Sequence, residues 1–293
     1  MERRCGFSAL DVTGTTYLAP ERIRAHPNFA EARDTYIRAI LDLYEGRPAL
    51  IELMRDGGRI MVYGIIMALW GGYREDDPKS LPTISRLKQT IGWFGVASPR
   101  QIDLIVARFA QVGHLEISPT PHDARMRRIL PKPALIEHDR AFLRAHCLAL
   151  ARLFGAEAYE KPLSGDRDVL KAMRGAWIVT LEAMAKEIFI ANPPVFRFYA
   201  ASSGILMLMR LVGMQHAAPN AWLAVDYTDF GRRFAVSRTH VRTLLKSIAQ
   251  EGDLEIDPEG RVRLSPDLLT AFDRNFAGRM SLLDRAHGTA MGV

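Results

Sequence analysis

The sequence is poor in the residues that build covalent or metal-held frameworks. It holds only two cysteines, Cys5 and Cys147, in 293 residues, so neither a disulfide framework nor a cysteine-based zinc site is expected. Its eight histidines show no metal-ligand spacing, since even His138 and His146 lie two helical turns apart. The chain also lacks the glycine patterns of nucleotide sites and any Ser/His/Asp or Cys/His catalytic set. We therefore expect no cofactor, no metal and no enzymatic activity.

Long apolar runs are absent as well. The longest strongly apolar stretch, 60–70, is too short to cross a bilayer, and Arg210 interrupts the stretch 205–214. The apolar patch near the N-terminus is broken by Asp11, which does not fit a secretory signal. The expectation is a cytoplasmic protein without a membrane partner.

Lysine is scarce, although the chain is basic. Net charge is +6 and the isoelectric point is about 9.5. Of the 39 basic residues seven are Lys, which leaves 32 Arg. The arginine guanidinium makes paired hydrogen bonds to phosphate and to guanine, so this balance is compatible with a nucleic-acid partner. A GC-rich coding bias explains the same composition, and the charge alone does not separate the two.

One stretch occurs twice, at 98–117 and at 237–256. The two copies align without a gap at a constant offset of 139 positions, so that Ser237 matches Ser98. Each copy opens on a serine suited to cap a helix. Gln101 completes a capping box with Ser98. Gly113 and Gly252 supply the left-handed residue that ends a helix, and Leu-Glu-Ile, an alternating strand pattern, follows in both copies. The pattern predicts a capped helix that leads into a strand, twice.

Both predicted helices have one apolar face with the spacing i, i+3, i+4, i+7, which is typical of burial on one side. The apolar positions are Ile102, Ile105, Val106 and Phe109 in the first copy and Val241, Leu244, Leu245 and Ile248 in the second. A hairpin follows each helix, over 115–131 and over 254–264, and a shorter helix precedes it. Helix, tight turn, helix and hairpin form the plan of a winged helix-turn-helix.

The first copy resembles the MarR family of bacterial transcriptional regulators. The match runs from Ser98 through Gly113-His114-Leu115-Glu116, then Asp123-Ala124-Arg125, then Ile129-Leu130-Pro131. In that family an Asp-x-Arg at the wing tip places the arginine in the minor groove while the aspartate orients it. The resemblance gives these roles to Arg125 and Asp123. The second copy departs from the pattern, since its wing is five residues shorter and lacks the motif, and it looks like a general bacterial winged helix, as in GntR-type regulators.

The resemblance covers roughly 31–155 and 168–290. MarR proteins are about half this length and act as homodimers through their first and last helices, so the resemblance implies a covalent pseudo-dimer. The predicted fold is mainly α with small β-hairpin wings, in which two winged helix-turn-helix units are joined by long helices in a pseudo-two-fold arrangement. The predicted parts are an N-terminal extension over 1–28, repeats over 29–156 and 168–293, and a linker over 157–167.

The residues off the apolar faces and on the hairpins are the candidate DNA contacts. In the first repeat these are Pro99, Arg100, Gln101, Leu104, Arg108, Asp123, Arg125 and Arg127. In the second repeat they are Arg238, Thr239, His240, Arg242, Thr243, Lys246, Arg261 and Arg263. Side chains near a recognition helix N-terminus reach base edges, whereas Arg108 and Lys246 are expected to touch phosphate. The alternative is an ordinary solvated helix face.

An effector cavity is the remaining candidate site. MarR-like proteins bind small aromatic acids between their long helices and DNA-binding lobes, and the resemblance points to Trp70, Trp177, Arg197 and Tyr199, with Arg197 as a partner for a carboxylate. Core packing explains the same aromatic residues.

The expected function is sequence-specific binding of double-stranded DNA to regulate transcription, as a repressor, with one monomeric chain on an asymmetric operator. Two alternatives stay open. A plasmid-type replication initiator also carries two winged helices in one chain, and a winged-helix interaction scaffold no longer reads DNA.

Overall fold

The computed structural model describes residues 8–10, 16–92, 96–120, 125–184 and 191–292. Over these ranges the chain is mainly helical, with helices α1 to α14 and three two-stranded antiparallel hairpins. This confirms the prediction of a mainly α protein with small hairpins. Within the same ranges, none of the helices combines the length and the apolar character needed to span a membrane.

The first half of the chain, residues 29–156, follows a simple order. Its helices and strands are α2 (Phe29–Tyr44), α3 (Pro48–Ile51), α4 (Gly57–Gly71), α5 (Ile84–Gly92), α6 (Pro99–Gln111), β3 (Leu115–Pro119), β4 (Arg127–Pro131) and α7 (Pro133–Phe154). Short 3-10 turns at Glu52–Met54 and Pro78–Ser80 flank α4.

The second half, residues 168–293, repeats that order. Its elements are α9 (Arg167–Met184), α10 (Pro193–Ala200), α11 (Gly204–Ala217), α12 (Tyr227–Arg233), α13 (Arg238–Gln250), β5 (Leu254–Ile256), β6 (Val262–Leu264) and α14 (Pro266–Met291). In both halves a short helix, a capped helix, a hairpin and a long helix follow one another.

The capped helices α6 and α13 form as the local signals predict. The Ser98 hydroxyl accepts from the Gln101 amide at 3.3 Å, and the Ser237 hydroxyl accepts from the His240 amide at 3.0 Å. All eight apolar positions of the two faces are buried. Gly113 and Gly252 take φ of +82° and +79°, the left-handed conformation expected of a residue that ends a helix.

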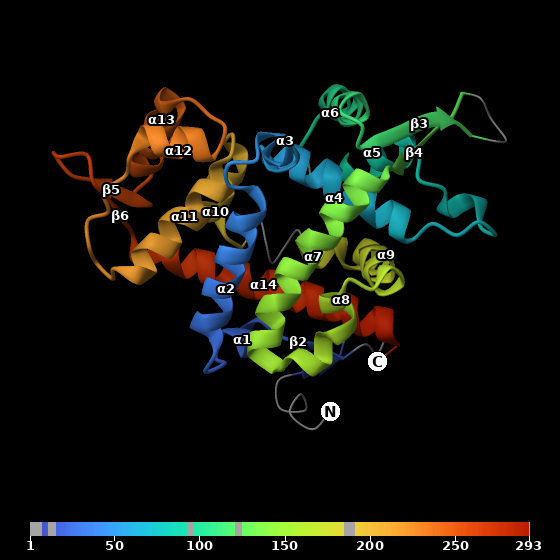
Figure 1. Cartoon of the computed structure of the whole chain (residues 1–293), viewed down its shortest axis with the longest axis horizontal. Coiled ribbons are helices and arrows are strands. Elements are labelled where there is room, and N and C mark those ends of the chain that lie inside the picture. The colour runs from blue at the N-terminus through green and yellow to red at the C-terminus, as the bar shows by residue number, and fades with distance from the viewer. Residues whose placement is uncertain (1–7, 11–15, 93–95, 121–124, 185–190, 293) are drawn as a thin grey trace.

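The long helices form one side of the molecule and the capped helices the other. Figure 1 shows α6 and α13 along one edge, each with its hairpin on the outer side, and α2, α7, α9 and α14 beneath them with both termini. The halves exchange contacts, because α4 packs on α9 and α11 packs on α2. A smaller hydrophobic cluster lies under α6, between α4, α5 and the first hairpin, whereas the larger one joins α13 to the long helices.

The described parts of the predicted N-terminal extension and of the predicted linker contact the long helices. Strands β1 (Ser8–Leu10) and β2 (Thr16–Leu18) form a hairpin, and α1 (Pro20–Arg24) follows. The Leu18 amide donates to Asp284 on α14 at 3.0 Å, and the buried Tyr159 hydroxyl donates to the same carboxylate at 2.7 Å. The predicted linker holds a 3-10 turn and α8 (Glu160–Ser164). The described parts of both segments pack on the long helices α7 and α14.

Candidate nucleic-acid interface

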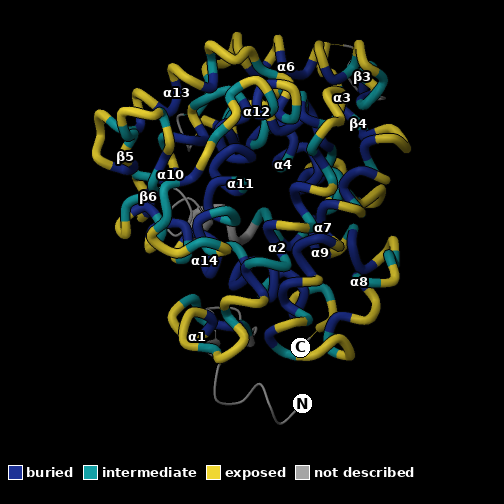
Figure 2. Tube along the Cα trace, turned by 60° about the vertical axis from the view of Figure 1, so that its left-hand side comes forward, coloured by how far each residue is buried: buried dark blue, intermediate teal, exposed yellow. Residues whose placement is uncertain are grey.

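The polar faces of α6 and α13 are exposed on the same edge of the molecule (Figures 1 and 2). The exposed predicted residues on α6 are Pro99, Arg100, Gln101, Leu104 and Arg108, and those on α13 are Arg238, Thr239, Arg242, Thr243 and Lys246. Figure 2 shows the exposed stretches of both helices on the outer surface of the molecule. The structure therefore places these side chains where a large partner has access to them.

Each hairpin is attached to its helix in the same way. Thr83, just before α5, forms a β-bridge with Arg128, and Leu223, before α12, forms one with Val262. The Lys132 amide donates to the His114 carbonyl at 2.9 Å, and the Ser265 amide donates to the Asp253 carbonyl at 3.0 Å. These backbone hydrogen bonds fix the angle between each exposed helix and the hairpin after it.

Gln101 takes part in the cap of helix α6, which limits the contacts that its side chain can make with a base. Its Oε1 accepts from the Ser98 amide at 2.8 Å and completes the predicted capping box. Recognition of adenine by a glutamine uses both the amide oxygen and the amide nitrogen. Because the oxygen already accepts this bond, a paired contact with adenine would compete with the capping box for the orientation of the Gln101 side chain.

His240 is also held by the protein. Its Nε2 lies 3.0 Å from the Ser202 carbonyl oxygen, and the side chain is half-buried. The hydrogen bond ties α13 to the turn between α10 and α11. His240 therefore belongs to the packing behind α13 more than to its exposed face, unlike its neighbour Thr239.

Among the described residues, the first hairpin carries one exposed arginine, Arg127, for which no ion pair is seen. Arg125 and Arg127 are exposed, and Arg127 has no salt-bridge partner in the part of the chain that the structure describes. Arg128 is half-buried, and its Nε donates to the Ser118 hydroxyl at 2.7 Å. Asp123, the predicted partner of Arg125, lies outside the described residues.

The arginines of the second hairpin are paired. Arg261 Nε donates to Asp257 Oδ2 at 2.6 Å, and Arg261 also lies 3.3 Å from Glu259. Arg263 donates to Glu255 at 2.8 Å and stacks over the Trp222 ring at 4.5 Å. The hydrogen bond that Arg261 donates to the Asp257 carboxylate raises the pKa of Arg261. Both arginines stand where the sequence placed them, but carboxylates of the same hairpin neutralise their charge.

The charges of the two exposed helices are distributed the other way round. Among the described residues, the second half has its unpaired cations on the helix rather than on the hairpin. Arg238, Arg242 and Lys246 on α13 have no salt-bridge partner among the described residues. On α6, Asp103 binds Lys88 of α5 at 2.7 Å, and Arg108 donates to Gln111 at 3.0 Å. The face of α13 is thus the more basic of the two.

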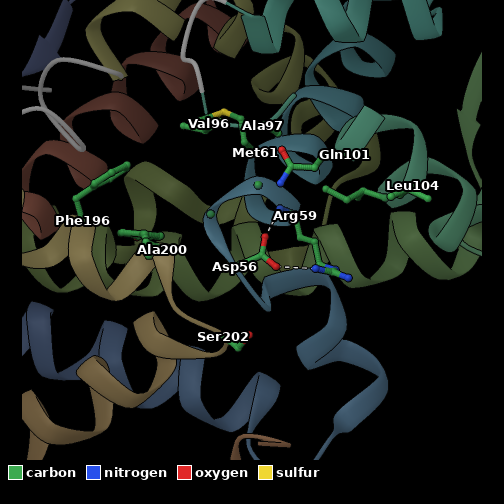
Figure 3. Close-up of a pocket in the computed structure, with 14 residues that line it drawn as sticks. Asp56, Arg59, Met61, Val96, Ala97, Gln101, Leu104, Phe196, Ala200 and Ser202 are labelled. Carbon is green, nitrogen blue, oxygen red and sulfur yellow. Dashed lines mark hydrogen bonds and ion pairs between the residues drawn. The ribbon is translucent and has the colours of Figure 1, made fainter. Parts of the chain in front are cut away.

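The cavities at Tyr199 and at Trp70 do not bring the four predicted effector residues together. Tyr199 lines a cavity of about 570 Å³ between α4, α6 and α10, together with Leu104 and Phe196 (Figure 3), whereas Trp70 lines another of about 260 Å³. Arg197 donates to Asp253 at 2.5 Å, so its charge is already paired. The Trp177 ring lies 3.9 Å from the Arg174 guanidinium carbon. Ion pairing and core packing therefore separate the four side chains.

The sequence did not predict the ion pairs that join the halves, two of which lie at equivalent places. Arg174 on α9 is fully buried and donates to Asp139 on α7, with Nε to Oδ2 at 2.9 Å. Arg33 on α2 binds Asp273 on α14 at 3.1 Å. In both cases the first helix of one half pairs with the last helix of the other. The signal was present, since Asp139-Arg140-Ala141-Phe142 and Asp273-Arg274-Asn275-Phe276 align, but the arginine partners lie elsewhere in the sequence.

Other kinds of site are not evident in the described ranges. No group of three or more His, Cys, Asp or Glu side chains there is close enough to hold a metal ion. No protein-family model, no curated protein and no solved structure matches the chain.

Proposed function

We propose that this chain binds double-stranded DNA with α6 and α13 as two recognition helices, each followed by a hairpin in the position of a wing. The observation that carries the proposal is the shared construction of the two exposed helices. Each has a serine cap, a buried apolar face, a left-handed glycine, a bridge to the second hairpin strand and the same closing backbone hydrogen bond. A helix-turn-helix places such a helix in the major groove.

The pairs between the halves support a pseudo-dimer in one chain. Arg174–Asp139 and Arg33–Asp273 link equivalent helices in opposite directions, as residues do across a two-fold axis. The helix contacts follow the same exchange, because α4 of the first half packs on α9 of the second and α11 of the second packs on α2 of the first. The chain thus presents two helices on one edge, as a homodimeric regulator does.

Charge supports nucleic acid as the partner. Six cationic side chains on this edge have no ion-pair partner among the described residues: Arg100, Arg108, Arg127, Arg238, Arg242 and Lys246. Cations in such positions release counterions from DNA when they bind phosphate, which favours association at low salt. We propose that the bound chain acts as a transcriptional repressor on an operator with two different halves. A replication initiator would instead bind repeated sites.

Binding to duplex DNA across a salt series tests the proposal. Fluorescence anisotropy on a mixed-sequence duplex compares the wild type with a triple variant, Arg238→Ala, Arg242→Ala and Lys246→Ala. The control is Arg22→Ala, Arg24→Ala and Lys161→Ala, which removes three exposed cations from α1 and α8 at the opposite edge (Figure 1).

The triple variant of α13 is expected to lower the salt slope by up to about three phosphate contacts, whereas the control should match the wild type. Equal losses in both variants would contradict the assignment of the edge. The absence of binding to any duplex at low salt would instead favour an interaction scaffold.

A further inference from the structure

We propose that the two halves contact DNA with different elements: the second half reads bases through α13, while the first half is anchored on phosphate through its hairpin β3–β4. This inference rests on the proposed function. It names which part of each half gives specificity and which gives affinity.

The two hairpins carry opposite net charge. Residues 115–131 hold three arginines and two carboxylates, a net charge of +1, whereas residues 254–264 hold two arginines and three carboxylates, a net charge of −1. Both arginines of the second hairpin are bonded to its own carboxylates. Bringing β5–β6 to a phosphate would place Glu255 and Glu259 near that phosphate as well. Like charges repel, so this hairpin is not a phosphate anchor.

The first hairpin offers a charge that needs no rearrangement. Arg127 opens strand β4 opposite Pro119, is exposed, and has no salt-bridge partner among the described residues. Ile117 pairs with Ile129 in the first hairpin, and Ile256 pairs with Val262 in the second. Arg128 and Arg261 each come one residue before these partners, so they occupy equivalent positions. Arg128 donates to the Ser118 hydroxyl at 2.7 Å and lies 3.8 Å from Glu116, whereas Arg261 donates directly to the Asp257 carboxylate at 2.6 Å. Arg127 is therefore the arginine of the first hairpin that is available to a phosphate.

The helices show the reverse distribution. The bounds of α13 enclose three cations and no carboxylate, whereas those of α6 enclose two arginines and Asp103. Arg238 stands in the first turn of α13, next to Thr239, and Thr243 follows one turn later. Arginine pairs with guanine O6 and N7, and threonine contacts either hydrogen-bonding edges or a thymine methyl. This set of side chains discriminates between bases.

The face of α6 discriminates less. Leu104, 64% exposed, occupies the position of Thr243 and offers a base edge nothing but apolar contact. Pro99 has no donor, and the Gln101 acceptor is engaged in the cap. Arg100 remains as the one cation of its first turn. The α6 half-site is therefore expected to tolerate base changes, apart from a preference for thymine opposite Leu104.

A mismatch scan of the selected operator tests this division. The operator is obtained by selection from a random duplex library, and anisotropy then measures each single base-pair change with the wild type and four variants. Two variants compare an arginine of each hairpin, Arg127→Ala and Arg261→Ala. Two compare the first-turn arginine of each helix, Arg100→Ala and Arg238→Ala. All four side chains are exposed, and thermal unfolding checks that the fold is unchanged.

Arg127→Ala should weaken binding to every duplex by a similar factor and lower the salt slope by about one, whereas Arg261→Ala should change affinity less than twofold. Arg238→Ala should remove discrimination of about tenfold or more at base pairs within a single half-site, whereas Arg100→Ala should weaken binding without a change in preference.

Two results would overturn the inference while leaving the proposed function intact. One is an Arg261→Ala loss equal to that of Arg127→Ala. The other is an operator whose two half-sites are equally sensitive to substitution. Failure of the wild type to bind any duplex is a separate outcome, which overturns the proposed function itself.

Discussion

Two of the ion pairs that join the halves, Arg174–Asp139 and Arg33–Asp273, occupy equivalent places but differ in their surroundings. Arg174 and Asp139 have side chains that are 0% and 5% exposed, and the guanidinium lies against the rings of Tyr63, Phe142 and Trp177. Arg33 and Asp273 are 10% and 25% exposed. A pair that water reaches can exchange partners at little cost, whereas a fully buried charge depends on the one partner it has.

The comparison shows that the halves keep a common plan while their environments diverge. The Arg174 end also holds a close backbone approach between the halves, since a Cβ atom added to Gly71 would lie 2.5 Å from the Gly175 nitrogen. The region around Arg174 is thus the tightly closed end of the interface between the halves.

Removing one partner of the buried pair should have the largest effect on stability. Arg174→Ala leaves Asp139 charged in the interior and is expected to cost about 3–5 kcal/mol. Arg33→Ala leaves Asp273 partly hydrated and should cost about 1 kcal/mol or less. Urea unfolding of both variants at pH 7.5 measures the difference.

A double variant separates charge from packing at the same site. Arg174→Met with Asp139→Leu removes both charges, and it should recover most of the stability that Arg174→Ala loses. Similar losses for Arg174→Ala and Arg33→Ala would show that the two ends of the interface are equivalent after all.

The sequence predicted those parts of the fold that depend on neighbouring residues. Ser98, Gly113 and the apolar face of α6 act within a few turns of one another, so their spacing alone was sufficient. The pairing of Arg174 with Asp139 was not predictable, because 35 positions separate them and no local pattern marks an arginine for burial.

Local patterns also failed where a distant residue supplies the packing. The segment around Tyr159 resembles a linker in composition, but Asp284, 125 positions away, binds the tyrosine hydroxyl and closes the segment onto α14. The candidate contacts on α6 and α13 were found by position. The neutralised state of Arg261 and the engaged oxygen of Gln101 needed the three-dimensional structure.

The second largest loss of stability is expected in mild acid, through His138 on α7. Burial lowers the pKa of His138 to about 4, against the influence of the adjacent Asp139. Between pH 6.5 and about 4, the His138 imidazole is protonated in the unfolded chain but stays neutral in the folded chain. The stabilising contribution is therefore full above pH 6.5 and is lost as pH falls, by about 3 kcal/mol in total.

The residue at the equivalent place on α14, 134 positions later, is Phe272. His138→Phe gives α7 the same side chain and should reduce the loss of unfolding free energy between pH 7.5 and 4.5, measured by urea titration at both values. An unchanged pH dependence in this variant would mean that His138 is not the responsible group.

Loss of a helix cap should have an intermediate effect confined to one half. Ser98→Ala and Ser237→Ala each remove the side-chain acceptor for the first turn and are expected to cost about 1 kcal/mol. Hydrogen exchange should accelerate mainly in α6 for the first variant and mainly in α13 for the second. Equal acceleration in both helices would indicate that the halves open as one unit.

The smallest expected effect concerns a bridge that the first half alone has at this place. Lys88 and Asp103 are 31% and 53% exposed, and the positions 139 residues later hold Tyr227 and Arg242, which cannot form an ion pair. Lys88→Ala should cost about 0.5 kcal/mol or less, and the difference from wild type should vanish in 1 M salt. A larger, salt-independent loss would assign Lys88 a packing role.

The number of chains on one operator tests the central claim most directly. Native mass spectrometry of the chain with the shortest selected duplex gives the stoichiometry, and hydroxyl-radical footprinting of the same complex gives the contacts. The account predicts one chain per duplex and two protected segments about one helical turn apart on the same face. Two chains per duplex, or one protected segment for a single chain, would contradict the assignment of α6 and α13 as the paired recognition helices of one molecule.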